Sequence, residues 1–337
     1  MKLNNNITIL DSLRAFAAIS VCLYHFICTT TGYIQTQWLL DLFSIGKYGV
    51  QLFFVISGFI IPWSMYQANF KLRNIFRFAL KRLTRLEPPY IISLVLALII
   101  LYVRQMFFAM EDNHINVNFN QVFLHFGYLI PFFEKYQWLN PVYWTLAIEF
   151  QYYFFIALLF IPLVNSTMVY RMGITVLILL LSFVGNNKFL LCWLPVFYIG
   201  IITFMFKTNF IRKKEFYFTL GFLVSFCLYK YPIVSVAYMI IPVLAILFFE
   251  NHKLQMFNFF GKMSYSIYLI HPLVGASLIN ILSHHYNSGF GKLIVILSGV
   301  LITLVSSYVM YLIVESPSKK LSASIKYDGR LFSLTKK

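Results

Sequence analysis

The chain has 337 residues, of which 60% are hydrophobic and only 11% are charged. A soluble globular domain carries about 25% charged residues to keep its surface hydrated, so the composition excludes an ordinary soluble protein and indicates a surface that faces lipid. The net charge of +16 could suggest nucleic acid, but Lys and Arg form short clusters between long apolar runs, as membrane insertion requires, and we expect no nucleic-acid partner.

Ten apolar segments are candidates for transmembrane helices. A helix needs about 20 apolar residues to cross the hydrocarbon core, and in lipid it satisfies its own backbone hydrogen bonds. The fifth to eighth segments are short and closely spaced, so their ends stay open and two of them could be re-entrant. The sequence predicts an all-α integral membrane protein with one domain over 1–337, a cytoplasmic tail over 316–337, and about ten spans between 7 and 315, near 7–29, 46–66, 88–108, 142–164, 172–187, 189–206, 216–231, 233–250, 263–283 and 292–314.

The basic residues predict how these segments are oriented. Ten spans place both termini on one side, and 20 of the 27 Lys and Arg residues fall on that side, against six on the other and Arg14 within the first span. Cytoplasmic segments of membrane proteins carry the excess of Lys and Arg. We therefore expect an N-in, C-in topology, with the longest outer loop at about 109–141.

The first segment carries two ionisable residues that lipid does not favour. Arg14 and His25 are eleven positions apart, about three helical turns, so they share a face with roughly 16 Å between them along the axis. Asp11 lies one turn before Arg14 and can offset its charge. Ionisable residues inside spans usually face a cavity, which predicts a polar track. Alternatively, His25 is a neutral core histidine and Arg14 extends to the cytoplasmic interface.

The second segment and the loop after it hold two further pairs. Ser57 and Gly58 are small, which lets another helix or a ligand approach the backbone closely. Arg82 and Arg85 are one helical turn apart, so both guanidinium groups could hold phosphates at the cytoplasmic rim. The alternative is that these arginines are ordinary positive-inside charge or contact anionic lipid.

Polar residues also occur in the fourth and ninth segments. Glu149 lies within the fourth, where a carboxylate needs a partner or a proton; it could equally brace Arg14 or act directly in catalysis. In the ninth, Ser264, Tyr268 and His271 recur at helical spacing and form a polar stripe. Tyrosines at span ends are often interface anchors, and His271 could simply cap a kink at the proline that follows it.

Neither a metal site nor a disulfide framework is indicated. The cysteines form no metal-ligand pattern, and all lie in apolar segments, where we expect buried packing residues: Cys22, Cys28, Cys192 and Cys227. A metal cofactor is therefore not expected.

Five motifs, taken together and in this order, resemble those of the acyltransferase-3 family. They are L-D-S-L-R-A-F-A-A-I-S-V-C-L-Y-H-F (10–26), F-F-V-I-S-G-F (53–59), R-L-T-R (82–85), W-T-L-A-I-E-F (144–150) and G-K-M-S-Y-S-I-Y-L-I-H (261–271). Each motif alone is weakly specific, but the resemblance covers residues 10–315, nearly the whole chain. The chain is similar to the short, single-domain members, which include proteins that acetylate exopolysaccharide.

The resemblance implies a membrane-bound O-acyltransferase with about ten helices in the bacterial cytoplasmic (inner) membrane. Family members move acyl groups, most often acetyl, from cytoplasmic acyl-CoA to carbohydrate hydroxyls, for example those of O-antigen, exopolysaccharide or capsule. Acyl-CoA, most simply acetyl-CoA, is then the co-substrate, and the expected partners are membrane lipid and a carbohydrate or lipid-linked glycan. The acceptor, the acyl chain and the oligomeric state stay open.

The implied mechanism gives each candidate residue a role. A histidine that titrates near neutrality can take the proton of the acceptor hydroxyl, so His25 is the expected general base, with a covalent acyl-histidine as the less favoured variant. A rival function is a transporter or flippase for a lipid-linked sugar or small solute, which would not consume acyl-CoA. The other candidates support catalysis (Arg14, Glu149), bind acyl-CoA (Arg82, Arg85, Ser57, Gly58) or line the acceptor path (Tyr268, His271).

Overall fold

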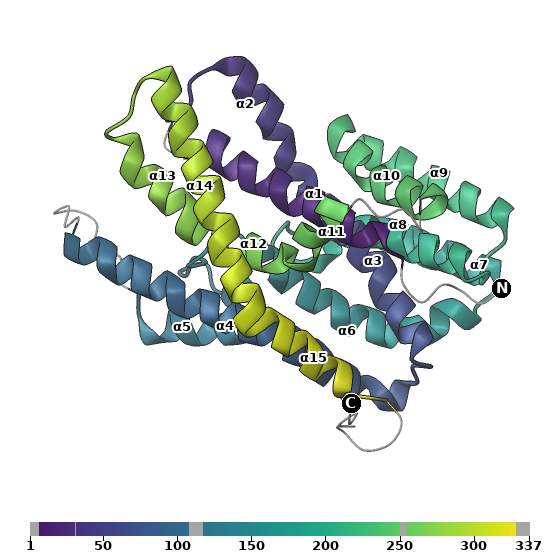
Figure 1. The fold of residues 1–337 in the computed structure, drawn as a ribbon. Coiled ribbons are helices and arrows are strands. Elements are labelled where there is room, and N and C mark those ends of the chain that lie inside the picture. The colour runs from purple at the N-terminus through teal and green to yellow at the C-terminus, as the bar shows by residue number, and fades with distance from the viewer. Residues whose placement is uncertain (1–6, 31, 108–116, 250–254, 328–337) are drawn as a thin grey trace.

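Helices make up all the regular secondary structure of the described residues, which in this computed structural model are 7–30, 32–107, 117–249 and 255–327 (Figure 1). The first half contains α1 (Ile9–Tyr24), α2 (Gln37–Ser44), α3 (Gly49–Gln67), α4 (Ile75–Phe107), α5 (Phe119–Phe126), α6 (Tyr143–Asn165) and α7 (Met168–Val184). The second half contains α8 (Leu190–Lys207), α9 (Lys213–Lys230), α10 (Ile233–Phe248), α11 (Gln255–Lys262), α12 (Ser264–Ile270), α13 (Ala276–Ser283), α14 (Gly289–Met310) and α15 (Ser316–Ser324). Short 3₁₀ helices cover Ile45–Tyr48, Leu72–Asn74 and Ile130–Phe132, and π-helical turns cover His25–Thr29, His271–Gly275 and Tyr311–Glu315.

The lengths and apolar composition of these helices confirm an all-α membrane fold for the described residues. Each of the ten predicted segments falls on a helix, but α7 and α10 are short for a span and α9 has charged residues at both ends. The count of ten and the N-in, C-in topology therefore stay predictions. Within the described residues, seven helical segments are long and apolar enough to cross a bilayer: Ile9–Thr29, Gln37–Gln67, Leu72–Met106, Tyr143–Asn165, Leu190–Lys207, Ser264–Ser283 and Gly289–Ser324.

Two segments predicted as connections are helical instead. The predicted loop before residue 88 is helical from Ile75, so α4 keeps two prolines in its interior; long membrane helices tolerate this where neighbours satisfy the freed backbone groups. Residues 316–324, predicted as the start of the tail, form α15, which continues from α14 and packs against α4. The hydroxyl of Ser322 donates to the backbone oxygen of Lys81 at 2.7 Å and fixes this contact. Tail residues 328–337 and loop residues 108–116 lie outside the described part.

Two glycines allow α3 and α8 to cross in close contact. A Cβ atom at Gly58 would lie 2.1 Å from the backbone oxygen of Phe197, and one at Gly200 would lie 2.1 Å from the backbone oxygen of Val55. Beside this crossing the rings of Phe54 and Phe197 stack with centroids 4.6 Å apart. The sequence predicted that either another helix or a ligand approaches Gly58, and at this position the structure has a helix.

Two distant parts of the sequence, α1 and the α11–α12 segment, run side by side in the same direction. A Cβ atom at Gly261 would lie 2.0 Å from the backbone oxygen of Asp11, and further along both segments the rings of His25 and His271 are 5.2 Å apart. In Figure 1, α2, α13 and the start of α14 gather at the upper left, whereas α15 and the start of α4 lie together at the bottom. Positions along α1 thus run from one end of the bundle to the other.

Candidate active site

A cavity of about 520 Å³ lies between α1, α3, α4, α6, α12 and α15. Its volume falls within the roughly 300–1,000 Å³ typical of small-molecule sites. Among its lining side chains five are basic and three are acidic, so the lining favours an anionic ligand. These charged residues are Arg14, Lys81, Arg85, Lys262 and Lys319, and Asp11, Glu149 and Glu315.

The two ends of this cavity differ in polarity. Lys262 follows Gly261, which packs on Asp11 near the start of α1, so one end is basic. Val50 follows Gly49, which packs on Ala17 further along α1, and the apolar lining begins there. The cavity therefore offers charged groups at one end and aliphatic and aromatic surface at the other.

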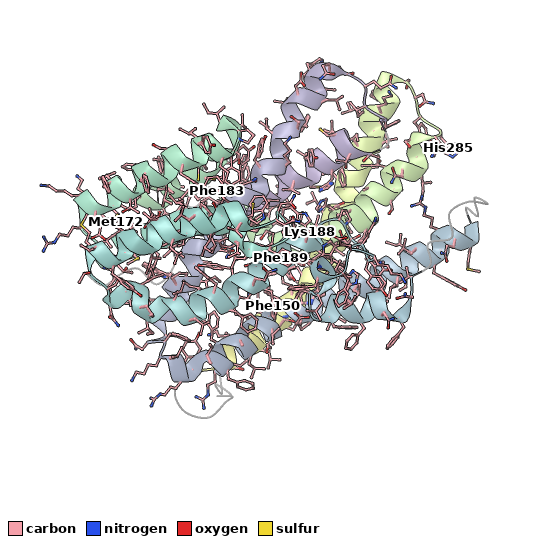
Figure 2. All side chains as sticks on the ribbon, turned by 180° about the vertical axis from the view of Figure 1, so that it is seen from behind. Phe150, Met172, Phe183, Lys188, Phe189 and His285 are labelled. Carbon is pink, nitrogen blue, oxygen red and sulfur yellow. The ribbon has the colours of Figure 1, made fainter. Side chains whose placement is uncertain are left out.

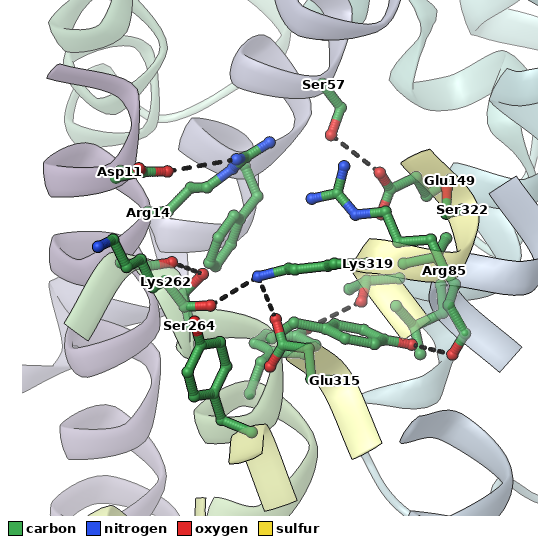
Figure 3. Close-up of a pocket in the computed structure, with 18 of the residues that line it drawn as sticks. Asp11, Arg14, Ser57, Arg85, Glu149, Lys262, Ser264, Glu315, Lys319 and Ser322 are labelled. Carbon is green, nitrogen blue, oxygen red and sulfur yellow. Dashed lines mark hydrogen bonds and ion pairs between the residues drawn. The ribbon is translucent and has the colours of Figure 1, made fainter. Parts of the chain in front are cut away.

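Arg14 and Arg85 face each other across the cavity. Figure 3 shows both guanidinium groups extended into the space, with Glu149 beside Arg85. Arg14 approaches Asp11 at 3.7 Å, a loose ion pair at the cavity edge. Among the described residues, no acidic side chain lies within 4.0 Å of Arg85, Lys81 or Lys262. Two facing cations repel each other, so an anion between them would stabilise the arrangement.

Glu149 projects into the same cavity from α6, but its partners are hydroxyl groups. Its Oε1 accepts hydrogen bonds from Ser57 at 3.0 Å and from Tyr153 at 2.7 Å. Two donors on one oxygen hold the carboxylate in place. Ser57 therefore contacts both the cavity and Glu149, whereas its neighbour Gly58 packs against α8.

An ion pair between Glu315 and Lys319 contributes to the basic end of the cavity. Glu315 is 1% exposed and lies 2.6 Å from the ammonium of Lys319, which also donates to the backbone oxygen of Lys262 at 2.6 Å. The other carboxylate oxygen accepts from the backbone N–H and hydroxyl of Ser266, at 3.1 and 2.5 Å. Sequence reasoning missed this pair, although its spacing of four residues is that of helical Glu–Lys pairs.

Arg82 does not line this cavity, so the structure does not bring the two predicted phosphate-binding arginines into one site. Its side chain is 8% exposed and donates to the hydroxyl of Ser64 at 2.5 Å. Its guanidinium also lies over the rings of Phe78 and Tyr153, at 5.3 and 5.7 Å from their centroids. Arg82 thus joins α4 to α3 and α6, while Arg85 faces the cavity.

His25 and His271 form a pair of imidazoles beyond the apolar end of the cavity. Their ring centroids are 5.2 Å apart, and His271 is completely buried. Nδ1–H of His271 donates to the backbone oxygen of Ile267 at 3.1 Å, and its Nε2 has no hydrogen-bond partner among the described residues. Neither histidine lines the cavity, but Tyr268 does, and its ring is 6.0 Å from that of His271.

Both histidines begin π-helical turns, a feature that the sequence did not predict. The turns are His25–Thr29 and His271–Gly275. The backbone oxygen of His25 also accepts hydrogen bonds from the hydroxyls of Thr29 at 2.8 Å and Thr30 at 3.0 Å. Single π turns inside α-helices are frequent at functional sites.

No group of three or more potential metal ligands occurs within the described ranges. All four cysteines are free thiols; Cys22 and Cys227 are buried as predicted, whereas Cys28 and Cys192 are partly exposed.

The sequence of this chain is similar to those of known proteins. The sequence profile of the acyltransferase-3 family, described as an acyltransferase domain, matches residues 7–312. O-acetyltransferase OatA of Staphylococcus aureus (strain NCTC 8325) is 30% identical over 169 residues, 48% of this chain and 25% of that protein. A Staphylococcus aureus (strain COL) protein named Putative O-acetyltransferase SACOL0978 is 23% identical over 375 residues, 92% of this chain and 57% of that protein. No solved structure matches.

The chain thus spans a quarter of OatA and little more than half of the second relative. The family match, in contrast, covers nearly the whole chain and confirms the resemblance drawn from the five motifs. This multi-pass membrane protein belongs to the acyltransferase-3 family, whose members transfer acyl groups.

Proposed function

We propose that this protein transfers an acyl group, most simply acetyl, from cytoplasmic acyl-CoA to a hydroxyl of a cell-surface carbohydrate. The cavity between Arg14 and Arg85 is the proposed donor site. The observation that carries the proposal is the pair of guanidinium groups that face each other beside Lys81 and Lys262. Within the described part of the chain, neither of these two lysines has an acidic partner. Guanidinium and ammonium groups bind phosphate oxygens strongly.

The shape of acyl-CoA matches the polarity of the cavity. The molecule carries phosphates at one end and a long, largely uncharged arm that ends in a thioester at the other. The basic end of the cavity, which holds Arg85 and Lys262, suits the phosphates, and the apolar end near Phe53 and Tyr268 suits the thioester arm. The positive-inside orientation predicted from the sequence places the basic end toward the cytoplasm, where acyl-CoA is made.

His25 is the proposed general base, and its hydrogen bonds favour one tautomer. Thr29 directs its hydroxyl proton to the backbone oxygen of His25 at 2.8 Å, so its oxygen is free to accept from Nδ1–H at 3.3 Å. Nε2 of the neutral ring then keeps its lone pair and can take a proton. Tyr268 lines the cavity and its ring is 6.0 Å from that of His271, so this side chain adjoins both the donor cavity and the pair of histidines.

The proposed reaction is an acyl transfer that passes through a tetrahedral intermediate. Nε2 of His25 takes the proton from the acceptor hydroxyl while its oxygen attacks the thioester carbon, and the resulting tetrahedral intermediate carries an oxyanion. Collapse of the intermediate forms the ester and expels the CoA thiolate, which takes the proton from the imidazolium. A positioned base of this kind contributes about 10²- to 10⁴-fold in rate. The hydroxyls of Thr145 and Tyr268 would stabilise the oxyanion from the cavity wall.

Two measurements test the proposal. Purified protein in detergent should release free CoA thiol from acetyl-CoA when an acceptor saccharide is present, whereas a transporter or flippase would consume none. Deleting the gene should remove acetyl ester from one surface glycan, as detected by mass spectrometry. Surface glycans that keep every acyl group after deletion would refute the carbohydrate acceptor.

A further inference from the structure

A second cavity, of about 510 Å³, lies at the start of α6 and of α8. Residues 130–138 form one wall, and the connection between α7 and α8 forms the other. Trp138, Trp144 and Trp193 line it, so three of the five tryptophans in the chain meet here. We call this space the tryptophan cavity.

Contacts between its two walls make the tryptophan cavity a preformed feature. The rings of Phe132 and Phe189 lie 5.1 Å apart and join the walls, and Figure 2 places Phe189 beside Lys188 at the start of α8. The indole N–H of Trp193 donates to the backbone oxygen of Asn187 at 2.9 Å, which fixes the α7–α8 connection. Gln121 donates in the same way to the backbone oxygen of Gln137 at 2.9 Å and fixes the other wall.

The lining combines flat aromatic faces with uncharged and oppositely charged polar groups. Trp138 and Trp144 are half-buried, and among the described residues neither indole N–H has a hydrogen-bond partner. Exposed Glu134, Gln137 and Lys188 add a carboxylate, an amide and an ammonium. One acid and one base leave no surplus charge, in contrast to the donor cavity.

This chemistry suits a saccharide better than other ligands. A sugar ring presents C–H groups that pack on aromatic faces, and hydroxyls that both donate and accept hydrogen bonds. A phosphate ligand would need a surplus of basic groups, and a lipid tail would need no polar lining. The volume falls within the roughly 300–1,000 Å³ range of ligand sites.

Aromatic rings connect the lining of the tryptophan cavity with that of the donor cavity. Phe54 lines the donor cavity, and its ring centroid is 5.5 Å from that of Trp193, which lines the tryptophan cavity. Trp144 contacts Trp193 at 5.7 Å and directly precedes Thr145, a residue of the donor cavity. A group bound in one cavity is therefore one layer of side chains from a group bound in the other.

We propose that the tryptophan cavity binds the saccharide acceptor, with the sugar ring against Trp138 or Trp144 and its hydroxyls on Glu134 and Gln137. The inference rests on the acyl transfer proposed above and adds where the acceptor is held and which side chains recognise it. The cavity lies on the predicted outer side, at the end of α8 where the α7–α8 connection is found. A surface saccharide would reach it without crossing the bilayer.

The test compares Trp138→Ala with Trp38→Ala in cells that lack the chromosomal gene. Trp38 is a matched control because it is a 64% exposed tryptophan on α2, outside both cavities. We expect Trp138→Ala to lower acyl ester on the surface saccharide at least about tenfold, as the loss of one stacked aromatic contact and its desolvated surroundings predicts. The affinity of each purified variant for acetyl-CoA, measured by calorimetry, should equal that of the wild type, and Trp38→Ala should acylate normally.

A second variant keeps the test decisive if Trp138→Ala unfolds and loses acetyl-CoA affinity. Glu134→Gln combined with Gln137→Ala changes only exposed side chains, and it should lower acylation while acetyl-CoA affinity is kept. Wild-type acylation by both pocket variants would overturn the saccharide assignment and leave the proposed function intact. Wild-type protein that neither binds acetyl-CoA nor acylates the saccharide would instead overturn the proposed function, and the saccharide assignment would fall with it.

Discussion

Arg82 and Arg85 are one turn apart on α4, yet replacing Arg85 by glutamine should change KM, whereas replacing Arg82 by glutamine should change stability. Arg85 lines the donor cavity and has no acidic partner there, so Arg85→Gln removes a ligand for the phosphates of acyl-CoA. A hydrogen bond to a charged group is worth about 1.5–3 kcal/mol. At about 1.4 kcal/mol for each factor of ten, KM for acetyl-CoA should rise about 10- to 100-fold with kcat nearly unchanged, since the contact is equal in ground and transition states.

Arg82→Gln should instead destabilise the protein. The buried guanidinium loses its hydrogen bond to Ser64 and its contacts with the rings of Phe78 and Tyr153. A charge-assisted hydrogen bond of about 1.5–3 kcal/mol and ring contacts of about 0.5–1 kcal/mol each give a loss of roughly 2–5 kcal/mol. We expect a lower Tm in detergent and a lower yield, while the protein that survives keeps the wild-type KM.

The assay measures thiol release against acetyl-CoA concentration for both variants, together with thermal stability by size-exclusion chromatography after heating. If Arg82→Gln raises KM at normal stability, both arginines hold phosphate, as the sequence alone suggested. The separate roles inferred here, donor binding by Arg85 and structural stabilisation by Arg82, would then be wrong. If Arg85→Gln leaves KM unchanged in a folded protein, the cavity is not the donor site.

Three further changes probe the site and the fold. His25→Ala should lower transfer by about 10²-fold or more at normal abundance; acylation measured at the wild-type rate would remove the proposed base. Glu149→Gln keeps the oxygen that accepts both hydroxyl hydrogen bonds, so a normal melting curve with at least about tenfold slower transfer would assign the charge to catalysis, and an unchanged rate would leave only bracing. Gly200→Leu should cost about 1–3 kcal/mol of stability or more because its Cβ would lie 2.1 Å from the backbone oxygen of Val55, while Gly221→Leu, where a Cβ meets nothing within 4 Å, should melt like the wild type.

Hydropathy predicted where the helices lie because a membrane span is a local property of the chain. All ten predicted segments are helical, including α9, whose charged ends make it a weak candidate by composition. Hydropathy did not predict the first part of α4 or any of α15, because these segments are rich in polar residues. They are stabilised by contacts between distant parts of the chain, such as the hydrogen bond from Ser322 to Lys81, and no local pattern reveals such a contact.

Motif spacing selected candidate polar residues, but it could not predict what each of them touches. Ser57 and Glu149 are both in the cavity as a hydrogen-bonded pair, although 92 positions separate them. Three residues along a helix differ by about 60° in direction, so the spacing of Arg82 and Arg85 allowed one shared face. The guanidinium of Arg82 is enclosed by the ring of Phe78 on α4 and that of Tyr153 on α6, whereas the guanidinium of Arg85 faces the cavity.

The start of α6 is the place where the proposed donor, acceptor and base come together. Trp144 lines the tryptophan cavity, and Thr145 lines the donor cavity. The hydroxyl of Thr145 is 2.8 Å from that of Tyr268, whose ring adjoins His271 and, through it, His25. Because neighbouring residues on a helix point about 100° apart, one turn can face two cavities at once. In the proposed reaction the acceptor hydroxyl and the thioester bind in different cavities but must react with each other. The first turn of α6, which faces both cavities, is where the two groups can approach.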